Sequence, residues 1–101
     1  MLTINNILEL YNKGVDIIIT NKPSDDAGEW DLSSLCVFLY KKNIKSKEEV
    51  YLTLIHELMH ARDDLIFNRP IDETRAEKEA IKTYFKRPYI TELLKDLYNF
   101  F

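Results

Sequence analysis

Apolar side chains follow two different periods along the chain, and each period predicts a different kind of element. Between residues 3 and 12 they recur every three or four positions, which is typical of an amphipathic helix. Gly14 then stands where a helix commonly ends in a left-handed conformation. The β-branched run 15–20 and the apolar run 35–40 predict strands, and the polar segment 21–31, which contains Pro and Gly, predicts a loop between them.

The second half of the chain predicts further helices. Ser46 and Glu49 have the spacing of a capping box, so we expect a helix over about residues 46–65. Asp72 is a favoured N-cap residue and predicts another helix over about residues 72–86. Helices therefore dominate and strands are few, which indicates an α+β domain.

The C-terminal segment, residues 89–101, predicts an amphipathic helix behind a break at Arg87-Pro88. Its apolar side chains alternate at spacings of three and four and form one stripe: Ile90, Leu93, Leu94, Leu97, Tyr98 and Phe101. The simplest expectation is that this stripe docks on the domain's own core. The alternatives are that it packs on a second copy in a swapped homodimer, or that it lies over a substrate cleft and regulates access.

Size and composition exclude several classes of protein. The chain has 101 residues, 46% apolar and 31% charged, enough for one small domain and unlike a disordered sequence. The net charge of −3, without an extended basic stripe, argues against a nucleic-acid partner. No apolar run exceeds six residues, and the N-terminus lacks a basic region, so we expect neither a membrane span nor a signal peptide. The single Cys36 excludes an internal disulfide and predicts a reducing, cytoplasmic setting.

The strongest chemical signal is the HExxH motif at His56, Glu57 and His60, inside the helix expected over residues 46–65. Residues four apart lie on one face of a helix, so both imidazoles can bind the same metal ion. Neutral imidazole is a preferred zinc ligand. Glu57 follows the first histidine, where its carboxylate can act as general base on a zinc-activated water.

The chain has no third histidine, so a catalytic zinc site would need a carboxylate as its third protein ligand. Glu73 and Glu77 lie one turn apart on the same face of the next predicted helix, whereas Glu79 lies on a different side. From spacing alone, either Glu73 or Glu77 can be this ligand. Charged residues on a helix are more often a solvated face, and these two gain meaning only from the incomplete two-histidine site.

Two acidic residues, Asp63 and Asp64, stand near the end of the motif-bearing helix. The helix dipole disfavours negative charge there. We therefore expect them to have local partners, such as Arg62, Arg69 or one of the histidines.

The HExxH motif followed by Glu73-Thr74-Arg75-Ala76-Glu77 resembles the gluzincin group of zinc metallopeptidases, in which the second segment lies on a glutamate helix. Within that group the chain is similar to the minigluzincins, minimal soluble relatives of membrane metallopeptidase catalytic domains, over about residues 28–80. The resemblance implies a small zincin with a short mixed sheet, an active-site helix and a glutamate helix. It implies that Zn²⁺ is held by His56, His60 and Glu73, with Glu57 as general base. It also implies that Glu77 holds one of the ligand imidazoles without touching the metal, which would fix its tautomer.

The resemblance extends to the substrate. Residues 28–30 and 35–40 resemble the edge strand before the active-site helix in these enzymes, where an extended peptide can add as a further strand. One departure is that no histidine remains to stabilise an oxyanion, and Tyr84, Tyr89 or Arg75 are the candidates to replace it.

These inferences predict a single metallopeptidase-like domain over residues 1–101, a zinc-dependent metalloendopeptidase acting on peptide or protein substrates. The minigluzincins are described as zymogen-like chains closed by their C-terminal segments, so the resemblance also implies latency through residues 89–101. The rival expectation is a non-catalytic zinc-binding regulatory or interaction module on the same scaffold. A purely structural helical domain is the third expectation, if zinc does not bind.

Overall fold

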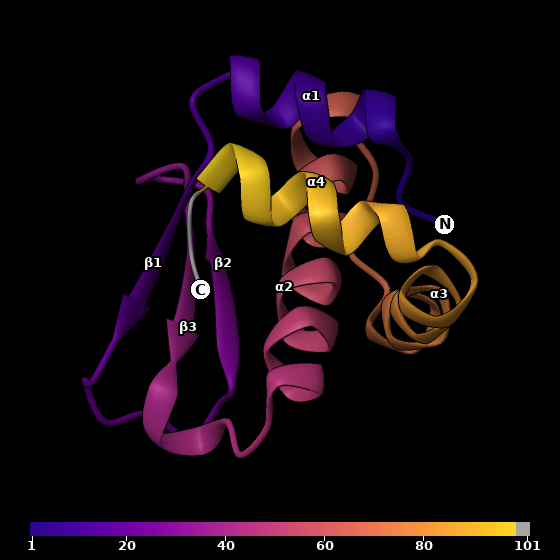
Figure 1. Ribbon diagram of the computed structural model, residues 1–101. Helices are drawn as coiled ribbons and strands as arrows, with labels where there is room; N and C mark the ends of the chain where they lie inside the picture. Colours follow the sequence, from indigo (N-terminus) through magenta and orange to yellow (C-terminus); the bar gives the residue numbers. More distant parts are fainter. Residues whose placement is uncertain (99–101) are drawn as a thin grey trace.

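Three short strands pack against a long helix, and three further helices surround that helix in the computed structural model, which describes residues 1–98 (Figure 1). The elements in chain order are α1 (Ile4–Asn12), β1 (Asp16–Thr20), β2 (Gly28–Asp31), β3 (Cys36–Tyr40), α2 (Lys47–Arg62), α3 (Glu73–Lys86) and α4 (Pro88–Tyr98). A 3-10 turn, Lys41–Asn43, precedes α2, and a π-helical turn, Asp63–Phe67, continues it. The α+β class and the mixed sheet expected from the sequence are confirmed.

The strand order is β1-β3-β2, with β1 parallel and β2 antiparallel to β3. The polar segment 21–31 is therefore not all loop, because its last four residues form the edge strand β2. The run 35–40, by contrast, forms the central strand and not the edge. It starts at Cys36, because Leu35 has φ +54° and belongs to the turn between β2 and β3. A four-residue strand with one large apolar side chain, Trp30, is too short for its alternation to be recognised in the sequence.

The ends of the helices follow local capping chemistry. Ser46 caps α2 as predicted, since its hydroxyl accepts a hydrogen bond from the Glu49 backbone N–H at 3.1 Å. The Glu49 carboxylate does not complete the capping box, because it accepts from the Lys45 N–H at 2.7 Å instead. Asp72 caps α3 by accepting from the Arg75 N–H at 3.0 Å. Gly14 has the expected left-handed conformation after α1, with φ +93°.

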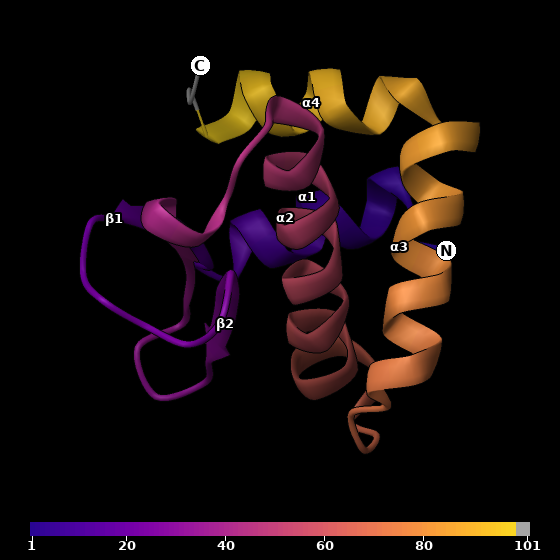
Figure 2. The ribbon, with the colours of Figure 1, turned by 90° about the horizontal axis from the view of Figure 1, so that it is seen from below.

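The core lies between α2 and the sheet. Figure 2 shows α2 with the sheet on one side and α3 on the other. Leu54, Ile55 and Leu58 of α2 are fully buried and belong to the same apolar cluster as Val37 and Leu39 of β3. This burial fixes which face of α2 points at the sheet, and so fixes the direction of the histidines.

The described part of the C-terminal helix docks on the domain's own core. Ile90 and Leu94 of α4 are fully buried, and the Tyr98 hydroxyl donates to the Val15 carbonyl at 3.1 Å. Phe101, the last residue of the predicted stripe, lies outside the described residues.

Removing α4 would expose the core, so we expect truncation from Thr91 to unfold the domain. Regulation or subunit exchange through residues 89–101 stays a prediction. Among residues 1–98, no helix is long and apolar enough to cross a membrane.

Of the two acidic residues after α2, Asp64 has a partner that the sequence did not predict, because it accepts a hydrogen bond from Trp30 Nε1 at 2.6 Å, whereas Asp63 has the predicted arginines and one more. Asp63 is almost fully buried and accepts from Arg69 Nε at 2.9 Å, with Arg62 Nη2 at 3.6 Å. The additional partner is Arg75 of α3, whose Nη2 donates to Asp63 at 2.8 Å. This bond ties the first turn of α3 to the end of α2.

Candidate metal centre

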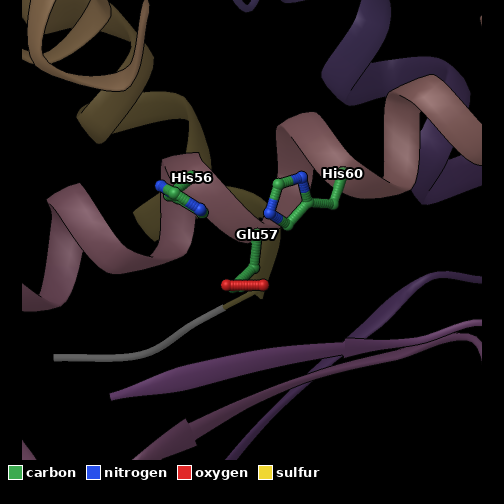
Figure 3. A group of neighbouring side chains, drawn as sticks. All are labelled: His56, Glu57 and His60. Carbon is green, nitrogen blue, oxygen red and sulfur yellow. The ribbon is translucent and has the colours of Figure 1, made fainter. Parts of the chain in front are cut away.

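The two histidines of the HExxH motif lie one turn apart on α2 and face the same region. Their ring centroids are 4.6 Å apart, with the ring planes nearly perpendicular at 88°. One ligand atom each from His56, Glu57 and His60 lies within 4.8 Å of the others. Figure 3 shows the three side chains, with Glu57 pointing from the helix toward the strands. The sequence-predicted cluster is thus brought together by a single helix.

Glu73 brings a fourth side chain to this cluster from the first residue of α3. Each of its two carboxylate oxygens lies close to one imidazole: Oε2 is 3.0 Å from His56 Nε2, and Oε1 is 2.9 Å from His60 Nε2. Glu77 lies one turn further along and lines the same cleft, but its carboxylate makes no hydrogen bond or ion pair with residues 1–98. Of the two carboxylates that the sequence left open, Glu73 is the one beside the histidines. The supporting role implied for Glu77 stays a prediction.

The chemistry around His60 fits a zinc ion. This side chain is buried, and neither Nδ1 nor Nε2 has a partner with hydrogen-bond geometry among the described residues, although Nε2 is close to Glu73. Buried polar atoms without partners are rare and costly. Two imidazole nitrogens and a carboxylate oxygen form a known zinc donor set, in which neighbouring tetrahedral donors are about 3.3 Å apart. The two contacts of Glu73 are close to that separation.

The protonation state of His60 also suits metal binding. Burial lowers the pKa of the His60 imidazole below its usual 6.5, although the Glu73 carboxylate acts in the opposite direction. The neutral ring therefore prevails at pH 7, and only a neutral imidazole offers a lone pair to a metal.

Glu57 is the buried carboxyl of the cluster. Burial, and after it the negative charges of Glu73 and Asp26, raise its pKa from 4.5 to about 7, against a hydrogen bond from the Trp30 backbone that lowers it. A carboxyl group that titrates near neutrality can both accept and return a proton at that pH, as general acid–base catalysis requires.

The raised pKa of Glu57 predicts how the stability of metal-free protein depends on pH. The folded state holds the Glu57 proton up to about pH 7, whereas the ordinary value is 4.5. This stabilisation is therefore fully present below pH 4.5 and is lost, by about 2–3 kcal/mol, as the pH rises to 7. Glu57→Gln mimics the protonated group, so the metal-free variant should melt above wild type at pH 8 and close to it at pH 4.5. Thermal unfolding followed by circular dichroism checks this, and a variant that melts below wild type at pH 8 contradicts it.

Gly28 allows β2 to approach α2 closely beside Glu57. A Cβ atom at Gly28 would lie 2.6 Å from Thr53 Cγ2, 3.1 Å from Glu57 Cγ and 3.2 Å from the Phe38 carbonyl oxygen. The first distance is too short for any real contact, and the Thr53 methyl group is held by a stiff β-branched side chain. The glycine therefore sets the spacing between the edge strand and α2.

Substitution of Gly28 should separate the two elements. We expect Gly28→Ala to destabilise the domain by about 1–3 kcal/mol, as overpacking does elsewhere. The double variant Gly28→Ala with Thr53→Ala removes the clashing methyl group and should recover part of that loss. Urea unfolding of wild type, both single variants and the double variant measures the coupling. Strict additivity of the two single effects would show that the contact does not limit the spacing.

The cluster opens into a cleft of about 620 Å³ between β2, α2 and α3. Its lining combines acidic groups with apolar side chains, among them Trp30, Ile71 and Ile81. None of the described residues of α4 contributes to this lining. Sequence reasoning singled out neither Asp26 nor Glu29 as a site residue, because the pattern assigned both to a polar loop and the resemblance gave residues 28–30 only a main-chain role.

The three candidates for stabilising an oxyanion do not line this cleft. Arg75 is bound to Asp63, and Tyr84 stacks on Tyr51 with ring centroids 6.5 Å apart. Tyr89 is exposed on α4. The structure therefore brings the HExxH residues and Glu73 together and leaves these three residues elsewhere.

The chain matches no protein-family model, no curated protein and no solved structure.

Proposed function

We propose that the protein is a zinc-dependent metalloendopeptidase. The observation that carries the proposal is the position of Glu73, whose carboxylate lies at 2.9 and 3.0 Å from the Nε2 atoms of both motif histidines, beside the buried Glu57. A solvated helix face would not explain why a carboxylate from a separate helix lies between these two rings. The proposal follows the HExxH chemistry and not the fold alone.

Each residue of the cluster has a distinct part in this mechanism. His56, His60 and Glu73 would hold the zinc ion, which when bound lowers the pKa of a water and polarises a carbonyl oxygen. The Glu57 carboxylate accepts a proton from the attacking water. It then delivers this proton to the nitrogen of the leaving amine, and its pKa of about 7 suits both transfers.

The free edge of β2 supports a peptide as substrate. Among residues 1–98 this strand pairs with β3 on one side only, and Gly28 brings it close to Glu57. An extended peptide can add to such an edge through main-chain hydrogen bonds, independently of its sequence. An edge strand beside the base places a scissile bond within reach of Glu57, as hydrolysis within a chain requires.

A second candidate function is a non-catalytic zinc-binding module for regulation or interaction. The observation that favours it is the cleft lining, which in the described chain holds no Tyr, Lys or Arg and no histidine outside the motif. A tetrahedral intermediate would then have the metal alone to stabilise its oxyanion, whereas an additional donor is worth about 10²–10³-fold in rate.

As for location, the unpaired Cys36 suits a reducing compartment, and we propose that the protein acts in the cytoplasm.

Metal content and peptide hydrolysis, measured on the same preparations, test the proposal. Wild type should contain one zinc per chain by elemental analysis, and His56→Ala should contain none while keeping its helical circular dichroism spectrum. Zinc-loaded wild type should also cleave members of a peptide library, and His56→Ala should cleave none. Zinc without cleavage would favour the non-catalytic module. Wild type that contains no zinc would indicate a purely structural helical domain.

A further inference from the structure

The cleft carries far more negative charge than the proposed zinc chemistry needs. Five carboxylates line it, and no lysine or arginine does among the described residues: Asp26, Glu29, Glu57, Glu73 and Glu77. The chain has 14 basic residues, so their exclusion from this cleft is not a matter of scarcity. A divalent ion offsets two of these charges, and two remain when Glu57 is protonated or replaced by glutamine.

The remaining acids have little structural use. Glu29 accepts a hydrogen bond from the Tyr40 hydroxyl at 2.7 Å. The carboxylates of Asp26 and Glu77 make no hydrogen bond or ion pair with residues 1–98. They come from opposite walls, with Asp26 before β2 and Glu77 on α3. Like charges gathered around one cleft repel each other and raise the local concentration of cations.

The cleft is a binding site and not only an acidic surface, because a buried polar side chain with an unpartnered nitrogen lines it. His60 is 4% exposed; its Nδ1 has no partner in the described chain, and its Nε2 has only the Glu73 carboxylate, at 2.9 Å but without hydrogen-bond geometry. Its apolar lining also suits one kind of cation. Trp30, Ile71 and Ile81 can pack against the aliphatic part of a lysine or arginine side chain, and the indole face of Trp30 can attract the cationic group.

We propose that this cleft selects basic peptides, with lysine or arginine side chains flanking the bond presented to Glu57. The inference rests on the proposed peptidase function for the position of that bond. The peptide main chain follows the free edge of β2, and its basic side chains lie near Asp26 on one wall and Glu77 on the other. The unneutralised carboxylates, partly screened by salt, should favour such a peptide by about tenfold over a neutral one.

Binding without turnover tests the charge preference directly. The probes are three capped hexapeptides of one length that carry lysine, glutamine or glutamate at the same two positions. They are titrated into zinc-loaded, full-length Glu57→Gln protein, which keeps them intact, and affinity is measured by calorimetry and by the fluorescence of Trp30, the single tryptophan. We expect the lysine peptide to bind about tenfold tighter than the glutamine peptide, and the glutamate peptide to bind weakest. Raising the salt from 50 to 500 mM should remove most of the difference.

A matched pair of variants assigns the preference to the cleft. Asp26→Asn removes a lining charge, whereas Asp25→Asn removes the neighbouring exposed charge, which does not line the cleft. In the same Glu57→Gln background, Asp26→Asn should reduce the lysine-to-glutamine affinity ratio about threefold, and Asp25→Asn should leave it unchanged. Equal affinities for the three peptides, or equal effects of the two variants, would overturn the inference.

Wild-type hydrolysis of the same peptides separates this inference from the proposed function. Cleavage without a preference for lysine rejects the basic specificity and leaves the peptidase intact. No cleavage of any peptide by the zinc-loaded enzyme rejects the peptidase, and the binding ratios then decide the charge preference alone.

Discussion

Glu57→Gln is expected to keep one zinc per chain and to lose peptide hydrolysis by about 10³-fold or more. The amide has the same shape as the carboxylic acid but cannot take a proton from water at neutral pH. The metal should remain, because the variant leaves His56, His60 and Glu73 in place. Elemental analysis and kcat/KM on one cleaved peptide measure both parts of this prediction.

A control on the same helix makes the result specific. Glu48→Gln removes an exposed carboxylate at the start of α2, away from the cleft, and should leave kcat/KM unchanged. Loss of zinc from Glu57→Gln would show that Glu57 is a ligand. Full activity in that variant would show that another group takes the proton.

Glu73→Ala is expected to weaken zinc binding by more than 10³-fold, and Glu77→Ala by about 10–100-fold at most. The first variant removes a carboxylate whose two oxygens each lie beside one imidazole, whereas the second removes a carboxylate that touches neither. The Glu73 side chain is 73% exposed, so its truncation should leave the fold intact. Competition with a chromophoric chelator gives the two affinities.

The two variants check each other, because both shorten a glutamate on the same face of α3. If Glu77→Ala causes the larger loss, the zinc ligand lies one turn further along the helix. Equal losses would indicate that the two carboxylates share the metal. Below about pH 5 both wild type and Glu77→Ala should release zinc, because protonated imidazoles cannot bind it.

The long periodic elements and the HExxH site could be predicted from the sequence, because their signals are local. A capped helix places His56 and His60 on one face regardless of what surrounds it. The edge strand β2 could not be predicted from its own pattern, because four residues are too few to show a period and its stability depends on pairing with β3. For the same reason, the position of Asp26 in the lining of the cleft could not be predicted.

The choice between Glu73 and Glu77 is a tertiary property. Both residues lie on one helix face, so only the placement of the first turn of α3 distinguishes them. That turn is fixed by the Asp72 cap and by the bond from Arg75 to the buried Asp63. Sequence reasoning expected partners for Asp63 but took them from its own helix and the following loop. It therefore missed the contact that positions Glu73, the proposed third ligand.

The donor set is divided unequally along the chain, and this has a consequence for folding. Residues 28–60 contain the edge strand, the β2–β3 hairpin, both histidines and Glu57, and these can associate through local contacts. Glu73 arrives only when α3 docks, so zinc held by the proposed site would stabilise the docked state selectively. Added zinc should slow amide hydrogen exchange in the first turn of α3 more than in the hairpin. In a cell, metal supply would then control the last step of assembly and not its beginning.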